Sequence, residues 1–158
     1  MDAPQKEYSD CLQKALRYLS VRNRSEKEMS DYLAKKNFEK DTLEKTIDYM
    51  KSRLLIDDER FALEYFARAR SKNYGQAKII LELKGKGISS KTIGLAAKNT
   101  GDTEYENCMA VAVKKLAVLK DASHKKLPLF LRGRGFDWNV IKRVLRDIGQ
   151  SELNTKDV

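Results

Sequence analysis

The sequence predicts an all-α fold of three tandem three-helix repeats, and two observations carry that prediction. First, six positions keep their chemical character when the chain is shifted by fifty and then by forty-eight residues, as expected for a copied supersecondary unit. Second, apolar residues recur at helical spacing, and no stretch alternates with period two over a strand's length. The three copies are Met29, Leu33, Asn37, Phe38, Leu43, Ile47; Ile79, Leu83, Gly87, Ile88, Ile93, Ala97; and Leu127, Leu131, Gly135, Phe136, Ile141, Leu145.

The first repeat illustrates the three helices that we expect in each copy. Its first helix presents one apolar face, which consists of Tyr8, Cys11, Leu12, Ala15, Leu16 and Leu19. A second helix should begin at Ser25, which forms an S-x-x-E capping box with Glu28. It should end at Asn37, and a third helix follows with Leu43 and Ile47 on its apolar face. Asn37, Gly87 and Gly135 tolerate the left-handed conformation that closes a helix, so we predict positive φ at all three.

The repeat also predicts how the chain is divided. We expect flexible tails at residues 1–7 and 150–158, and repeats at residues 8–56, 57–103 and 104–149. Because units of such an array contact only their neighbours, we expect an elongated, curved solenoid of undetermined hand.

Pro128 departs from the repeat pattern, since its counterparts Ser30 and Ile80 lie inside the second helix. Proline fits only the first turn of a helix, so this helix should begin late or irregularly in the third repeat.

Composition favours a polyanionic partner and a reduced compartment. The net charge of +9 is concentrated between Lys114 and Arg146, a segment that contains ten basic and two acidic residues. A field of this kind attracts polyanions or acidic protein surfaces. The two cysteines show no paired spacing, and no apolar run approaches the length of a signal sequence or a membrane span. We therefore expect a cytoplasmic monomer with no membrane contact.

Two columns of basic residues persist through the repeat alignment, and in a solenoid each would form a row. The columns are Arg22, Lys72, Lys120 and Lys36, Lys86, Arg134. Both columns lie at expected helix C-termini, where a cation also complements the helix dipole, so a capping role and a binding role both stay open.

Trp138 occupies an expected solvent position. It is either a local packing staple, which we favour, or an exposed contact residue. The candidate partner- or nucleic-acid-binding residues are Arg22, Lys36, Lys72, Lys84, Lys86, Lys120, Lys125, Lys126, Arg132, Arg134 and Trp138.

No enzyme, cofactor site or metal site is expected from the motifs. Asp57, Asp58 and Glu59 suit the N-cap and first turn of a helix better than paired acid–base chemistry. His124 is the only histidine and has no cysteine or histidine partner nearby in sequence. The glycines of residues 84–87 follow a helix, which argues against a phosphate-binding loop. A DNA-reading helix–turn–helix at residues 83–93 is also disfavoured, because the outer face of its third helix lacks the side chains used in base readout.

Several motifs in order resemble the RecX family, regulators of the RecA recombinase. Residues 56–62 resemble its LDD-x-RFA signature, and residues 22–33 its R-x-x-S-E-x-E-L-x-x-x-L opening. Residues 74–79 and 82–88 resemble its G-x-x-R-I-x-x-E-L-x-x-K-G-I centre, and residues 131–136 its L-x-x-R-G-F close. The resemblance covers residues 15–148, with Ile56 in place of leucine, Lys78 in place of arginine, and Gly85 and Gly133 added.

The resemblance implies an all-helical, non-enzymatic protein that binds the RecA nucleoprotein filament. Such a protein would limit filament extension and so inhibit strand exchange and linked ATP hydrolysis, in DNA repair and recombination and the SOS response. Independently, the charge excess of the third repeat leads us to expect weak contact with single- and double-stranded DNA, without sequence preference. A stand-alone, non-specific DNA-binding helical module is the alternative function, and a passive helical scaffold is the third.

Overall fold

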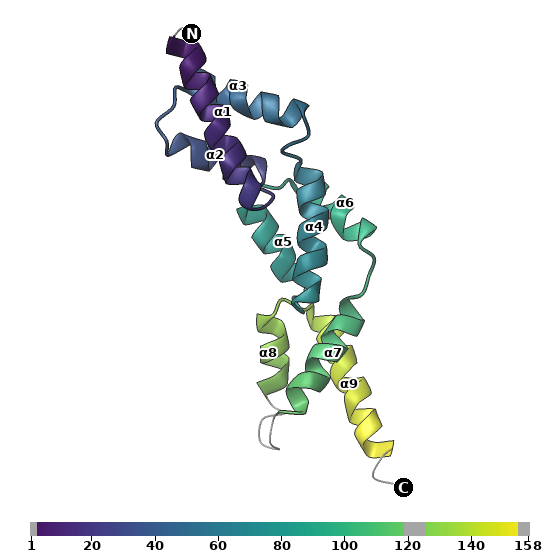
Figure 1. Cartoon of the computed structure of the whole chain (residues 1–158). Helices are drawn as coiled ribbons and strands as arrows, with labels where there is room; N and C mark the ends of the chain where they lie inside the picture. The colour runs from purple at the N-terminus through teal and green to yellow at the C-terminus, as the bar shows by residue number, and fades with distance from the viewer. Residues whose placement is uncertain (1–2, 119–125, 155–158) are drawn as a thin grey trace. The chain divides into compact units, whose positions relative to one another are not determined.

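The computed structural model describes residues 3–118 and 126–154, and these residues form nine α-helices and no strand. The all-helical prediction is therefore confirmed over the described chain (Figure 1). The helices are α1 (Ala3–Val21), α2 (Glu26–Ala34), α3 (Lys40–Ser52), α4 (Asp58–Ser71), α5 (Gln76–Gly85), α6 (Ser90–Asn99), α7 (Glu104–Leu116), α8 (Leu127–Gly133) and α9 (Trp138–Asn154). None of the described helices is long and apolar enough to cross a bilayer.

The same closing turn follows α2, α5 and α8, as the repeat alignment predicts. The φ angles are 58° at Asn37, 82° at Gly87 and 87° at Gly135. After α5, the N–H of Ile88 donates to the carbonyl oxygen of Leu83 at 3.1 Å, which satisfies a carbonyl left over at the helix end. The predicted positive φ is confirmed at all three positions.

Helix starts also follow their predicted caps. At α2, the Ser25 hydroxyl accepts from the Glu28 N–H at 3.2 Å, and the Glu28 carboxylate accepts from the Ser25 N–H at 3.3 Å. At α4, one carboxylate oxygen of Asp57 accepts from the N–H groups of Glu59 and Arg60 at 2.9 and 3.0 Å. The acidic segment therefore caps a helix, as its sequence predicts.

Proline shortens the second helix of the third repeat. Pro128 lies in the first turn of α8, which has seven residues against ten in the equivalent α5. The late start predicted from Pro128 is confirmed, because proline lacks the N–H that an interior helical position needs.

Both terminal helices extend into the segments expected as tails. Helix α1 begins at Ala3 and α9 continues to Asn154. At the N-terminal end, the Glu7 carboxylate accepts from the N–H of Glu39 at 2.8 Å and from the hydroxyl of Thr42 at 3.4 Å. These hydrogen bonds hold the first turns of α1, whose polar residues show no helical apolar periodicity in the sequence. At the other end, extending a formed helix costs little until a breaker intervenes.

The chain folds into two compact units. Unit 1 comprises Met1–Glu64 and Leu83–Ala96, and unit 2 comprises Tyr65–Glu82 and Ala97–Val158, so the boundaries fall inside α4, α5 and α6. One core in unit 1 is formed by Cys11, Ala15, Met29, Leu33, Ile47, Met50 and Ile56. One in unit 2 is formed by Cys108, Val111, Ala112, Leu127, Leu131, Phe136, Ile141 and Val144. The division into three repeats remains an interpretation of the sequence.

Candidate functional site

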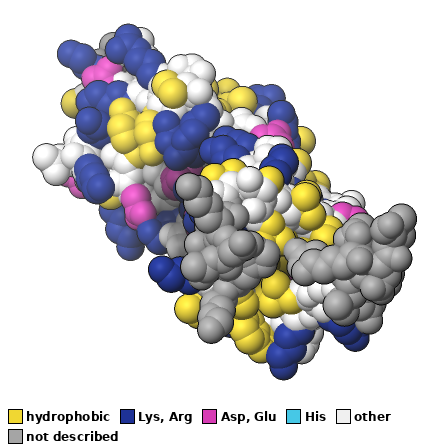
Figure 2. Space-filling model, turned by 90° about the horizontal axis from the view of Figure 1, so that it is seen from below, with side chains coloured by type: hydrophobic (Ala, Val, Ile, Leu, Met, Phe, Trp, Pro, Cys, Tyr) yellow, Lys and Arg dark blue, Asp and Glu magenta, His cyan; other side chains and the backbone are white. Residues whose placement is uncertain are grey.

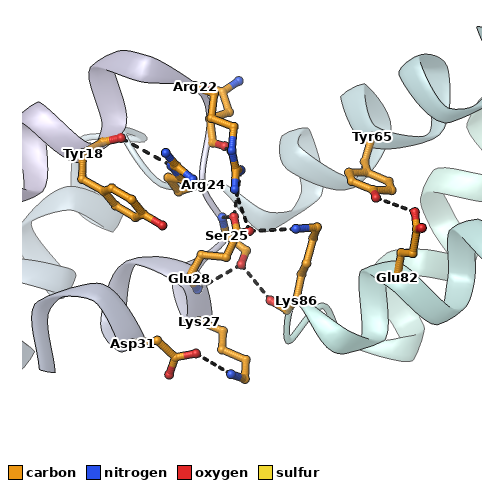
Figure 3. A network of polar contacts seen from close by, with 11 residues as sticks. Tyr18, Arg22, Arg24, Ser25, Lys27, Glu28, Asp31, Tyr65, Glu82 and Lys86 are labelled. Atoms are coloured by element: carbon orange, nitrogen blue, oxygen red, sulfur yellow. Dashed lines mark hydrogen bonds and ion pairs between the residues drawn. The ribbon is translucent and has the colours of Figure 1, made fainter. Parts of the chain in front are cut away.

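In unit 1, Glu28 connects two of the predicted binding residues. Its carboxylate lies 2.9 Å from the Arg22 guanidinium and 2.8 Å from the Lys86 ammonium (Figure 3). Burial raises the pKa of Glu28, but hydrogen bonds from Arg22, Lys86 and the Ser25 backbone outweigh it and lower the pKa to about 2. Arg22 and Lys86 therefore share one carboxylate, and part of their charge is compensated within the protein.

The turn after α5 is joined to the start of α2 by a second contact. The Ser25 hydroxyl donates to the carbonyl oxygen of Lys86 at 2.7 Å, and Ser25 is fully buried. A Cβ atom on Gly87 would lie 2.6 Å from the Cβ of Lys27, so only glycine fits there without displacement. Lys86 thus belongs to a joint with the preceding repeat and does not merely cap its own helix.

Unit 2 contains an equivalent joint built from backbone. The N–H of Gly75 donates to the carbonyl oxygen of Arg134 at 2.9 Å, and that of Ala77 donates to Gly135 at 3.1 Å. Gly75 and Arg134 are the repeat counterparts of Ser25 and Lys86. The turn after α8 therefore accepts hydrogen bonds from N–H groups at the start of α5, which the helix itself cannot satisfy.

The Glu104 carboxylate supports the same region of unit 2. One of its oxygens accepts from the N–H of Asp137 at 3.1 Å and from the N–H of Gln76 at 3.4 Å. These residues begin or precede α9 and α5, so a single anion serves two helix N-termini.

Arg134 also takes part in a cluster of cations around an aromatic ring. The Arg134 guanidinium lies 5.1 Å and the Lys115 ammonium 4.9 Å from the centre of the Phe130 ring. Arg134 further donates to the carbonyl oxygen of Lys72, just beyond the end of α4, at 3.4 Å. A hollow beside the ring is lined by Asn73, Val111, Lys114, Lys115, Phe130 and Arg134.

The other predicted basic residues lie at the surface or outside the described chain. Lys36, Lys72, Lys84, Lys126 and Arg132 are exposed, whereas Lys120 and Lys125 fall in the segment that the structure does not describe. Figure 2 shows one face of the protein on which Lys and Arg side chains are abundant and acidic ones are few. Both proposed columns include residues of the two units, so their alignment into rows stays a prediction.

Trp138 is exposed at the first position of α9, and its role as a packing staple or as a contact residue stays a prediction. It retains 41% of its accessible surface, and its described ring neighbour is Lys142, whose ammonium lies 6.0 Å from the ring centre. The repeat counterparts, Lys40 and Ser90, are also exposed. The position is therefore solvent-facing in all three copies.

Sequence reasoning missed Lys114, Lys115 and Phe130 as a group. The available indication was a break in the repeat, because Lys114 stands where the second repeat has the fully buried Phe66. A charged residue at a position that is apolar in the second repeat indicates that this part of the third repeat faces solvent.

The described residues contain no group of three or more His, Cys, Asp or Glu side chains that could hold a metal ion.

Comparison with known proteins identifies two domains of one family. Residues 11–50 match the first three-helix domain of RecX, and residues 57–96 match the second. Regulatory protein RecX from Chlorobium limicola is 37% identical over 142 residues, which cover 87% of this chain and 88% of the relative. Its counterpart from Clostridium perfringens (strain 13) is 33% identical over 154 residues, covering 92% and 72%.

A solved structure agrees with the fold. The crystal structure of RecX from Lactobacillus salivarius matches with a TM-score of 0.81 at 23% identity, covering 92% of this chain and 99% of that one. The matches in sequence extend over most of the chain, and the structural match confirms the all-helical architecture. The chain therefore belongs to the RecX family of regulatory, non-enzymatic proteins.

Proposed function

We propose that this protein regulates the RecA recombinase by binding the RecA nucleoprotein filament in the cytoplasm. It limits extension of the filament and so inhibits strand exchange and linked ATP hydrolysis. The observation that carries the proposal is membership of the RecX family over most of the chain. The protein acts as a monomer and touches DNA weakly, without sequence preference.

The charge distribution supports such a partner. A RecA filament on DNA presents phosphates, and the basic excess between Lys114 and Arg146 matches them in sign. Exposed Trp138 lies within the same stretch and has the large amphipathic ring that protein interfaces favour. Contacts distributed over several repeats would add their effects, since each later contact forms intramolecularly.

The decisive experiment measures ATP hydrolysis by RecA on single-stranded DNA with increasing amounts of this protein. We expect inhibition at substoichiometric amounts, because stopping growth at filament ends requires fewer molecules than coating the filament. Trp138→Ala should weaken inhibition. Val21→Ala is the matched control, since Val21 is an exposed apolar residue at the end of α1.

The second candidate function is a stand-alone DNA-binding module, which the basic hollow of unit 2 favours. It would take precedence if the wild type left RecA hydrolysis unchanged while it bound naked DNA tightly. Binding to RecA filaments and to single-stranded DNA should therefore be compared at one salt concentration.

A further inference from the structure

Unit 2 holds a basic hollow whose cations are arranged by an aromatic ring. Lys114 and Lys115 come from the last turn of α7, Phe130 comes from α8, and Arg134 follows α8. The hollow has a volume of about 280 Å³, near the lower limit of small-ligand pockets, roughly 300–1,000 Å³. It is therefore suited to a compact charged group and not to a large ligand.

The Phe130 ring orders two of these side chains without cancelling their charge. The Lys115 ammonium and the Arg134 guanidinium both lie within about 6 Å of the ring centre, the range in which a ring quadrupole attracts a cation. No described carboxylate forms an ion pair with Lys114, Lys115 or Arg134. By contrast, Arg22 and Lys86 share the Glu28 carboxylate. The cations of the hollow are thus better placed to attract an external anion than Arg22 and Lys86 are.

The side chains around the hollow suit phosphate. A guanidinium offers a planar set of donors that matches phosphate oxygens, and an ammonium adds a compact charge. Asn73, on the rim, has a side-chain amide that can donate hydrogen bonds. No Asp or Glu is among the described residues that line the hollow.

An acidic protein segment fits this surface less well. Protein interfaces usually need an apolar anchor at their centre. Here Val111 is 5% exposed, and Phe130 is half-buried with two cations against its ring. The two apolar residues that line the hollow are therefore buried or half-buried, and its three cations match a phosphodiester backbone.

We propose that the hollow formed by Lys114, Lys115, Phe130 and Arg134 binds the phosphates of a DNA strand. This inference rests on the proposed function for its biological setting, since it names the nucleic-acid contact of a filament regulator. Neutralisation of phosphates by these three cations releases counterions, so binding must weaken as salt rises.

The test uses the full chain and a dye-labelled oligothymidine, with fluorescence anisotropy measured over a series of salt concentrations. Lys114→Gln, Lys115→Gln and Arg134→Gln should each weaken binding and reduce the slope of log affinity against log salt by about 0.7–1. Phe130→Leu retains every charge but removes the ring, so affinity should fall with net charge unchanged.

Two controls remove the same charge elsewhere. Lys40→Gln changes a side chain that is 86% exposed and whose ammonium lies 3.7 Å from Glu44, and Lys51→Gln changes the partner of Glu26 in unit 1. Neither should alter the salt slope by more than a small fraction of the effect at the hollow. Circular dichroism melts of every variant separate loss of binding from loss of folding.

The outcomes distinguish this inference from the proposed function. If hollow and control variants lose affinity equally, or the hollow variants lose none, the phosphate site is wrong. Loss of RecA inhibition by hollow variants whose DNA affinity is unchanged would instead assign the surface to an acidic protein partner. If oligothymidine binding follows the prediction while wild type fails to inhibit RecA hydrolysis, the phosphate site stands and the regulatory proposal fails.

Discussion

The backbone N–H of Gly75 donates a hydrogen bond to the carbonyl oxygen of Arg134, at 2.9 Å, across fifty-nine positions of sequence. The approach is so close that a Cβ atom on Gly75 would lie 2.3 Å from the carbonyl carbon of Gly135. Gly75 is thus required because another backbone occupies the space of a side chain. The same joint in unit 1 uses a serine, because there the side chain itself makes the hydrogen bond.

Replacement of Gly75 by alanine should therefore destabilise unit 2. We expect the free energy of unfolding to fall by about 1–3 kcal/mol or more, since the methyl group must displace backbone atoms. Urea unfolding followed by circular dichroism measures this loss. Gly149→Ala is the matched control, because Gly149 lies inside α9 with nothing within 4 Å of its added Cβ. That change should stabilise by about 0.5–1 kcal/mol, and equal effects at the two glycines would contradict the proposed close approach.

Glu28 should make the stability of unit 1 depend on pH in the acid range. Burial raises its pKa, but the hydrogen bonds from Arg22 and Lys86 prevail and the folded value is about 2, against 4.5 for the ordinary group. Because the folded pKa is the lower one, the stabilisation is present above about pH 4.5 and is lost as pH falls towards 2. Unfolding measured between pH 7 and 2 should show this loss in the wild type.

Glu28→Gln removes the titrating group and should flatten that part of the pH profile. The variant should also be less stable at pH 7, because a neutral amide replaces the carboxylate that accepts two hydrogen bonds from Arg22 and one from Lys86. Glu44→Gln is the control, since the Glu44 side chain is 61% exposed and its contact with Lys40 spans 3.7 Å. A wild-type profile that is no steeper than that of Glu28→Gln would show that the carboxylate is not held in its charged form.

Local features were predictable from sequence because they depend on residues near one another. The S-x-x-E box at Ser25 needs partners three residues apart, and the positive φ of Asn37 follows from its side chain and its place after a helix. Pro128 shortens α8 for an equally local reason. Periodicity and turn chemistry therefore recovered the helices, apart from the ends of α1 and α9.

The joints and the basic hollow were not predictable, because their partners are distant in sequence. Glu28 meets Lys86 across fifty-eight positions, and nothing in either residue's neighbourhood specifies the other. Alignment of the repeats placed Lys86 and Arg134 at the same position, yet the first pairs with a carboxylate and the second lies against Phe130. Repeat equivalence thus predicts backbone position better than it predicts side-chain partners.

Both cysteines should resist labelling by a thiol reagent in the folded protein. Cys11 and Cys108 are fully buried, and burial raises the pKa of both thiols, that of Cys108 to about 12. At pH 8 the reactive thiolate is therefore scarce as well as inaccessible. We expect slow labelling by Ellman's reagent in buffer and rapid labelling of two thiols in denaturant. Fast reaction of one thiol in buffer would show that the unit containing it opens locally.

Lys86→Glu should act mainly through folding, which limits its use as a test of binding. The new carboxylate would face Glu28 in place of the ammonium that now lies 2.8 Å away, and the Lys86 side chain is only 26% exposed. Arg22 would remain as a partner of Glu28, so we expect a loss on the order of 2 kcal/mol in the free energy of unfolding. Lys84→Glu reverses an exposed charge two positions earlier and should cost less than about 1 kcal/mol, the range for a charge near a helix end. Urea unfolding of the two variants makes the comparison, and RecA inhibition should be read only where the variant is folded. If Lys86→Glu were as stable as Lys84→Glu, the Glu28 joint would not stabilise unit 1, and Lys86 would again be a candidate for direct contact with the filament.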